Sequence, residues 1–312
     1  MKPVVTLGET MGLFRAVTPG PLSQVTEFEL GFGGADSNVA IGLARLGTPV
    51  RWVGRVGSDG IGDRIIRELE AEGVDVVAIT DPSAPTGLMI KEQGTSDARP
   101  VIYYRTNSAG SRLTPDDVAT ADIEHAALLH VTGITPALSE TAHDAVLSAI
   151  RVAEAAGVPI SFDVNHRGSL WRDRDHASVY RELASAADIV FAGDDEARIL
   201  VPDAGSPAEQ STAIAAAGPS QVIIKLGARG CVAHIDGVDY TQAALSITPI
   251  DTVGAGDAFV AGYLAELISG SSPAERLRTA AAVGAYACLH IGDWEGFPTR
   301  AELARLEANA VD

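Results

Sequence analysis

The residues best suited to chemistry lie in one stretch near the C-terminal end of the chain, Asp251-Thr-Val-Gly-Ala-Gly-Asp257, which leads into an apolar segment ending at Ile268. A glycine turn that opens a helix presents unpaired backbone N–H groups and the positive end of the helix dipole, which suits a phosphate. Asp257 lies at the same point, where a carboxylate can accept a hydroxyl proton. The stretch favours phosphoryl transfer; a glycine turn capped by an aspartate is the alternative.

Length and composition favour one large α/β domain. The chain has 312 residues, of which 46% are hydrophobic and 32 are glycine, as in a compact protein with many tight turns. Its net charge of −18 argues against nucleic acid and against an anionic membrane as partners, because both require a basic surface. Lysine is rare, so arginine carries most of the positive charge that can grip a carboxylate or phosphate.

Three features lead us to expect a protein of the reducing cytoplasm. Cys231 and Cys288 give neither a disulfide framework nor a metal-ligand cluster. The first residues lack a basic start followed by an apolar stretch, and no apolar run approaches eighteen residues.

Most of the chain alternates between buried strands and amphipathic helices, which is typical of an α/β fold. We expect strands at 4–9, 51–56, 127–133, 159–165, 188–192 and 221–227, and a hairpin partner at 231–237. We expect helices at 39–47, 60–73, 139–156 and 273–290.

Short strands of a different character predict a small β lid. They lie at 12–17, 27–30, 86–91 and 100–105, with a polar, glycine-containing turn between the last two. Tyr103 and Arg105 are two residues apart and so point to the same face of the strand, which would place an aromatic ring beside a guanidinium group. The alternative is a solvated arginine on an edge strand.

Further polar residues lie where strands end or helices begin. Asp163, Asn165 and Arg167 alternate after a buried strand, and ligands bind at the carboxyl edge of open α/β sheets. Asn38 follows Gly33-Gly34 in a first helical turn, where it can bond a sugar hydroxyl or form a local cap. Glu196 also opens a helix, where an acidic side chain usually complements the dipole.

Several motifs of other enzyme classes are missing from the sequence. There is no Gly-x-x-x-x-Gly-Lys-Ser/Thr loop, and Phe259 replaces the third glycine that a dinucleotide fingerprint would require after Gly254-Ala-Gly256. The histidines do not cluster at metal-ligand spacing, and no serine lies in a Gly-x-Ser-x-Gly elbow. Phosphoryl transfer without a P-loop remains.

Gly33-Gly34 with Asn38, and the stretch from Asp251 to Asp257, resemble the two signature regions of the ribokinase-like (PfkB) carbohydrate kinases over essentially the whole chain. The resemblance implies one domain, 1–312, built on a doubly wound, mostly parallel sheet flanked by helices. Strands of a small β lid would be inserted at about 12–32 and 85–107. It further implies ATP as the phosphate donor and Mg²⁺ as the charge-neutralising ion; a monovalent cation is left open.

Family roles carry over position by position. Asp257 would be the base on the sugar hydroxyl, and the N–H groups of Gly254, Ala255 and Gly256 would form the anion hole. Glu196 matches the last residue of the family's Asn-x-x-Glu motif, which acts on the metal through water, although Gly193 replaces the asparagine. The residues expected at the nucleotide are Lys225, Gly227, Gly230, Gly254 and Gly256.

Within that family, Tyr103-Tyr-Arg105, Asp163-Val-Asn-His-Arg167 and Gly292-Asp293 resemble 2-keto-3-deoxygluconate kinases. Arg105 and Arg167 would supply a local positive field for a sugar acid in an acidic protein. The expected reaction is ATP-dependent phosphorylation of the C6 hydroxyl, with the gluconate or galactonate epimer left open. The substrate residues would be Gly34, Asn38, Tyr103, Arg105, Asn165, Arg167 and Asp293.

The sequence leaves two alternative functions open: a neutral-sugar kinase of the fructokinase or ribokinase type, and a sugar-acid or nucleotide-binding regulator without catalysis. The lid strands have edges that a second subunit could cover, so we expect a homo-oligomer assembled through the lid.

Overall fold

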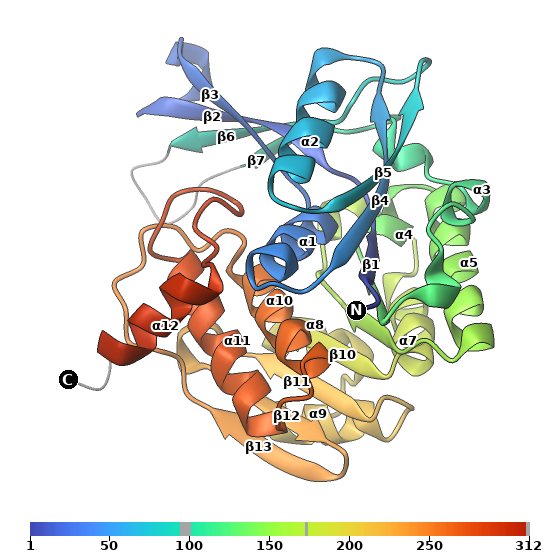
Figure 1. Cartoon of the computed structure of the whole chain (residues 1–312), viewed down its shortest axis with the longest axis vertical. Helices are drawn as coiled ribbons and strands as arrows, with labels where there is room; N and C mark the ends of the chain where they lie inside the picture. Colours follow the sequence, from blue (N-terminus) through green and yellow to red (C-terminus); the bar gives the residue numbers. More distant parts are fainter. Residues whose placement is uncertain (94–100, 172–173, 310–312) are drawn as a thin grey trace.

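The structure is a computed structural model that describes residues 1–93, 101–171 and 174–309. Among these residues the larger sheet has nine strands in the order β13-β12-β11-β10-β9-β8-β1-β4-β5 (Figure 1). Pairing is parallel from β11 to β5 and antiparallel for β12 and β13. Their bounds are β1 Val4–Leu7, β4 Val50–Gly57, β5 Asp75–Asp81, β8 Leu128–Thr132, β9 Ile160–Asp163, β10 Ile189–Gly193, β11 Gln221–Lys225, β12 Cys231–Ile235 and β13 Val238–Gln242.

The strand order reverses beside β1. From β1 the chain adds β4 and β5 on one side, and it then returns to add β8 to β13 on the other. The doubly wound sheet is therefore confirmed, and a ligand crevice is expected where the carboxyl ends of β1 and β8 diverge.

Helices cover both faces of this sheet (Figure 1). One core lies under α1, α2, α10 and α11, and the other lies under α3, α5, α7, α8 and α9. The longer helices are α1 Ala35–Arg45, α2 Gly60–Ala71, α5 Glu140–Ala156, α7 His176–Ala186, α8 Asp194–Leu200, α9 Pro207–Ala215, α10 Ala255–Ile268, α11 Pro273–Ala287 and α12 Arg300–Asn309. The single-turn helices are α3 Pro115–Val118, α4 Thr135–Leu138 and α6 Gly168–Trp171.

Within the described residues, a separate sheet of four strands has the order β3-β2-β6-β7, and we call it the lid sheet. Its strands are β2 Met11–Pro19, β3 Phe28–Gly33, β6 Leu88–Gln93 and β7 Val101–Tyr104. Its small apolar core is made by Met11, Leu13 and Met89. The polar turn expected between β6 and β7 falls largely at 94–100, outside the described residues.

The edge strands β5 and β13 were not foreseen from the sequence. The side chains of β5 are mostly half-buried, and those of β13 are half-buried or exposed. β13 has no continuous apolar run, as is common for an edge strand with a neighbour on one side only, whereas β5 contains the apolar run Val76-Val-Ala-Ile79, a usable signal that sequence reasoning missed.

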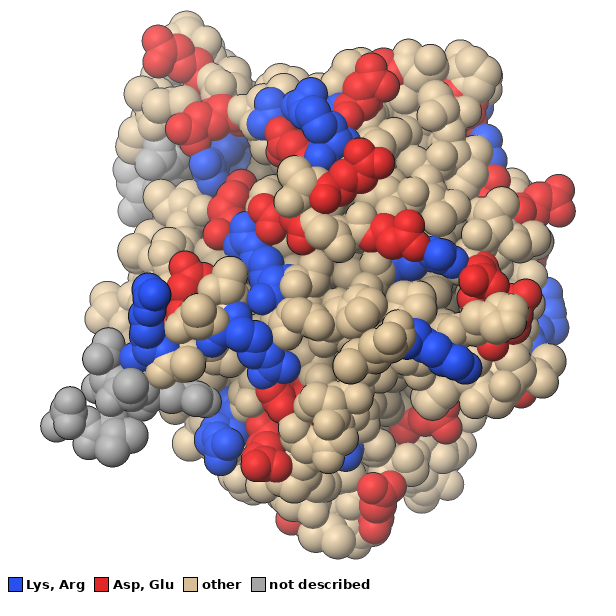
Figure 2. All heavy atoms as spheres, in the orientation of Figure 1, with Lys and Arg blue, Asp and Glu red and all other residues tan. Residues whose placement is uncertain are grey.

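No described helix is long and apolar enough to cross a membrane. On the face drawn in Figure 2, basic side chains are interspersed with acidic ones. That face therefore offers no continuous basic stripe of the kind that nucleic acid binding requires.

Candidate active site

The stretch from Asp251 to Asp257 forms the loop that precedes α10 and the beginning of the first turn of that helix. Gly254 is the residue before the helix and has a φ of 74°, in the left-handed region that favours glycine. A side chain at Gly254 would collide with the backbone carbonyl oxygen of Asp293. The turn thus requires glycine for two reasons, and it leaves the first N–H groups of α10 at the carboxyl edge of the sheet. Of the three expected anion-hole groups, the Ala255 N–H also makes a long bond, 3.3 Å, to the Thr252 carbonyl.

The carboxylate of Asp257 is held by two asparagine amides. Asn38 Nδ2 donates to Asp257 Oδ2 at 2.8 Å, although the two residues are 219 positions apart. Asn165 Nδ2 donates to Asp257 Oδ1 at 3.3 Å. The structure therefore brings together three residues that the sequence placed on three separate segments, namely α1, the end of β9 and α10.

Burial gives Asp257 the character of a base. Desolvation raises its pKa to about 6, and the nearby Asp163 carboxylate also raises it. The bond from Asn38 and the positive charges of Arg167 and Lys225 lower it. A carboxylate with a pKa near 6 is ionised at neutral pH and still accepts a proton more readily than an ordinary aspartate.

The turn after β9 carries two of the expected substrate residues. Asn165 has a φ of 38°, a left-handed conformation that asparagine tolerates better than most residues, and this turn directs its amide to Asp257. Arg167 is exposed, and its Nη1 donates to the His166 carbonyl at 3.1 Å. Arg167 thus keeps most of its donors available at the site.

Arg105 has a partner that the sequence did not indicate. Its Nε and Nη2 lie 2.7 Å and 2.5 Å from Glu9 Oε2, and both side chains are buried. Ser108 also donates to the Glu9 carboxylate. The Arg105 guanidinium lies 5.8 Å from the centre of the Tyr103 ring, as the predicted shared face requires. Arg105 is not a solvated edge residue, and Glu9 neutralises much of its charge.

Asp293 lies where the lid sheet meets the main sheet. A side-chain carbon at Gly33 would be 2.6 Å from Asp293 Oδ2, and one at Gly34 would collide with the Glu9 carbonyl, so both glycines permit close approach. Burial raises the pKa of Asp293 to about 7; Lys91 lowers it, and neighbouring carboxylates, including Asp257, raise it. Asp293 is thus a second buried carboxyl group within electrostatic reach of Asp257.

A pocket of about 540 Å³ lies at the ends of β9, β10 and β11, and His166, between Asn165 and Arg167, lines it. Lys225 lines it, and its Nζ is 2.7 Å from Asp163 Oδ2. A side chain added at Gly256 would be 3.7 Å from the same Nζ, so the lysine lies close to the first turn of α10. The full lining is His166, Gly193, Asp194, Asp195, Glu196, Ile199, Lys225, Leu226 and Arg229.

The expected glycine turn borders this pocket. Gly227 and Gly230 have φ values of 56° and 90°, both in the left-handed region. A side chain at Gly230 would collide with the Gln242 carbonyl on β13. These glycines are therefore required by the hairpin itself, whatever ligand lies beside them.

Glu196 joins two of the loops at the pocket. Its Oε1 accepts the His166 N–H at 2.8 Å, and its Oε2 accepts the Gly193 N–H at 2.6 Å. Gly193 replaces an asparagine of the family motif, yet Glu196 still accepts a hydrogen bond from the backbone N–H of Gly193. Each carboxylate oxygen has a second lone pair that can face the pocket.

Two acidic residues at the site were missed by sequence reasoning, Glu9 and Asp36. Glu9 follows the first buried strand at the carboxyl edge, and that position was a usable signal. Asp36 lies in the first turn of α1 and is fully buried, and its carboxylate accepts hydrogen bonds from Thr132 and Thr135. Burial and the nearby Asp257 carboxylate raise its pKa well above its usual value. Asp36 precedes the helix expected at 39–47, and an acidic residue just after Gly33-Gly34 gave no signal for such burial.

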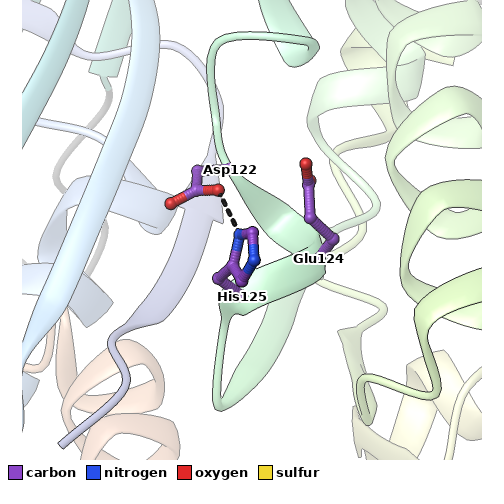
Figure 3. A group of neighbouring side chains, drawn as sticks. All are labelled: Asp122, Glu124 and His125. Carbon is purple, nitrogen blue, oxygen red and sulfur yellow. Dashed lines mark hydrogen bonds and ion pairs between the residues drawn. The ribbon is translucent and has the colours of Figure 1, made fainter.

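Asp122, Glu124 and His125 form another group of potential metal ligands within the described residues (Figure 3). All three are exposed and precede β8, at the opposite edge of the sheet from Asp257. Asp122 already pairs with His125 at 2.6 Å and with Arg51 at 3.5 Å. This group is therefore separate from the candidate site.

Comparisons with known proteins agree with this geometry. The sequence model of the pfkB family of carbohydrate kinases matches residues 1–300 of this chain. A 2-dehydro-3-deoxygluconokinase from Bacillus subtilis (strain 168) is 38% identical over 304 residues, which are 96% of this chain and 94% of the relative. A 2-dehydro-3-deoxygluconokinase from Thermoproteus tenax is 36% identical over 309 residues, 97% of this chain and 93% of the relative.

Among solved structures, a ribokinase II from E. coli in complex with ATP and Mg²⁺ has a TM-score of 0.92 at 26% identity. The match covers 99% of this chain and 100% of that one. The family match, the two relatives and the arrangement around Asp257 lead to one conclusion. The chain belongs to the pfkB family of carbohydrate kinases.

Proposed function

We propose that this protein is an ATP-dependent kinase that phosphorylates the C6 hydroxyl of 2-keto-3-deoxygluconate, also called 2-dehydro-3-deoxygluconate. The observation that supports this most is the Asp257 carboxylate, buried between two amides at the start of α10. A base beside unpaired helical N–H groups suits transfer of a phosphoryl group to a hydroxyl. The names of the two relatives favour the sugar acid as acceptor.

In the proposed reaction Asp257 accepts the proton of the C6 hydroxyl. The hydroxyl oxygen forms a bond to the γ-phosphorus, and the bond from that phosphorus to the ADP oxygen breaks. The backbone N–H groups of Gly254, Ala255 and Gly256 stabilise the charge on the transferred phosphate. Asn38 and Asn165 orient the carboxylate of Asp257, so that its proton-accepting lone pair is fixed before the substrate binds.

The remaining polar groups would bind the sugar acid. Arg167 presents an exposed guanidinium next to Asn165 and would clamp the carboxylate. Arg105, neutralised by Glu9, would orient Tyr103 and donate to the substrate with its remaining N–H groups. Asp293 and the Gly34 backbone would bond the hydroxyl or keto groups.

The pocket beside Lys225 would take the nucleotide phosphates. Lys225 and Arg229 provide positive charge there, and the expected nucleotide glycines Gly227, Gly230 and Gly256 lie in the turns beside these residues. Carboxylate oxygens are the ligands that Mg²⁺ prefers, so Glu196 fits a role at the metal through a bound water, with Asp194 near it. When bound, the ion would neutralise charge on the phosphates. We assign all these roles to one domain that acts in the cytoplasm.

The lid sheet would also form the interface between two copies of the chain. Phe28 and Tyr104 lie on the face of the lid sheet opposite Met89 and Lys91, and they are 37% and 59% exposed, unusually high for large apolar side chains. We expect light scattering after size exclusion to give at least a dimer, and Tyr104→Asp to shift it towards the monomer. A monomeric wild-type protein would rule out this assembly.

An ADP-release assay across sugars and sugar acids tests the proposed function. We expect turnover with 2-keto-3-deoxygluconate well above that with fructose or ribose, and the galactonate epimer is included in the panel. Turnover with a neutral sugar alone would make the protein a neutral-sugar kinase. Ligand-induced thermal stabilisation without any ADP release would make it a non-catalytic binding protein.

Asp257→Asn should lower turnover by ~10²-fold or more while leaving ligand binding largely intact, because the amide keeps the shape but cannot accept the proton. The measurement is kcat from ADP release together with the sugar-acid Kd from calorimetry. Asp63→Asn, an exposed aspartate on α2, is the matched control and should match the wild type. An unchanged rate for Asp257→Asn would remove Asp257 from the role of base.

Arg167→Ala should raise KM for the sugar acid by about tenfold, because an exposed guanidinium gives a charge-assisted bond at the weaker end of its range. Activity with a poorly used neutral sugar should change much less. Arg67→Ala, on exposed α2 surface, controls for the loss of positive charge. Equal effects of Arg167→Ala on both sugars would contradict the carboxylate clamp.

A further inference from the structure

A buried ion pair connects the lid sheet to the catalytic stretch. Lys91 on β6 places its Nζ 2.7 Å from Oδ2 of Asp251, the first residue of the stretch that ends at Asp257. The two side chains are 3% and 4% exposed and lie 160 positions apart in the sequence. Neither the reaction proposed above nor its substrate contacts uses Lys91.

On the lid side, Lys91 belongs to the surface that faces the proposed substrate. Met89, two residues earlier on the same face of β6, pairs across the sheet with Tyr103. The Met89 methyl group would be 3.0 Å from a side-chain carbon placed at Gly33, next to Asp293. A shift of β6 would therefore move Lys91 together with residues proposed to contact the sugar.

On the other side, Asp251 shapes the turn that leads to α10. Its Oδ1 accepts the Val253 N–H at 3.3 Å, one residue before Gly254. The N–H groups of Ile250 and Asp251 both donate to the Cys288 carbonyl, at 2.7 Å and 3.3 Å. The position of the Asp251 carboxylate is thus linked to the backbone that presents the anion-hole N–H groups.

Stability alone is a weak reason for such a pair. Burying two charges costs desolvation energy that their attraction only partly returns, so well-packed apolar residues are often as stable. Separating the pair, in contrast, takes the buried Lys91 ammonium away from a carboxylate oxygen that lies 2.7 Å from it, which costs energy in an interior site. The position of β6 and the shape of the Asp251 turn are therefore energetically dependent on each other.

We propose that Lys91 is a positioning residue which, through Asp251, links the lid position set by the bound sugar to the N–H groups that hold the nucleotide phosphate. The proposal rests on the proposed function, since it needs the lid to touch the acceptor and the turn to touch the phosphate. Sugar and nucleotide should then each tighten the binding of the other, by the same factor in both directions.

Calorimetry of the full chain measures this factor. A non-hydrolysable ATP analogue with Mg²⁺ is titrated with and without saturating acceptor sugar, and the sugar is titrated with and without the analogue. We expect the wild-type Kd values to fall about 5- to 150-fold in both directions, the usual range of coupling between two sites. Lys91→Met should bring the factor to within about twofold of one.

Arg15→Met is the matched control. Arg15 is the cross-strand neighbour of Lys91 on β2, but its ion pair with Glu29 stays within the lid sheet. This variant removes the same charge and should keep the wild-type factor. If circular dichroism shows that Lys91→Met is unfolded, Lys91→Gln, which retains a hydrogen-bond donor for Asp251, replaces it. Lys91→Gln should lose most of the coupling between sugar and nucleotide binding.

Three results would overturn the proposal: a wild-type factor near one, a Lys91 variant with the wild-type factor, or an equal loss in Arg15→Met. Failure of the proposed substrate is a separate outcome. If 2-keto-3-deoxygluconate is not turned over in the ADP-release assay, the coupling is measured with the sugar that is.

Discussion

The site depends on one constraint, the burial of the Asp257 carboxylate between two amide donors at the start of a helix. Asn38, Asn165 and Asp257 belong to three segments that meet only if α1, the end of β9 and α10 lie at the same edge of the sheet. The doubly wound order brings them there, because the strand order reverses beside β1. Burial then raises the pKa of Asp257 to about 6, which makes the carboxylate useful as a base.

Charge is distributed unevenly in this acidic protein. Three buried carboxyl groups, Asp36, Asp257 and Asp293, have raised pKa values at or beneath the site, while Lys225 and Lys91 balance Asp163 and Asp251. Two of the three lysines in the sequence therefore serve ion pairs around α10. The scarcity of lysine thus leaves arginine as the residue available for the substrate carboxylate.

Much of the fold could be predicted from the sequence because its signals are local. Buried strands at 128–132 and 160–163, and the turn at Gly254, follow from apolar runs and from glycine. Contacts across the fold have no such signal. The Glu9 partner of Arg105 is 96 positions away, and the edge strand β13 lacks an apolar run. Glu196 was assigned to a metal by family motif, yet it also accepts two backbone N–H groups, a role that only the loop geometry reveals.

The most direct test of the central claim is the pH dependence of kcat/KM for the sugar acid, in the wild type and in Asp293→Asn. Asp257 must be ionised to accept a proton, so kcat/KM should fall as the pH decreases through about 6. Asp293, with a pKa of about 7, is a second buried carboxyl group that titrates in this range. The account predicts that Asp293→Asn keeps the fall near pH 6. A profile that is flat down to about pH 5, or a fall that disappears in Asp293→Asn, would contradict it.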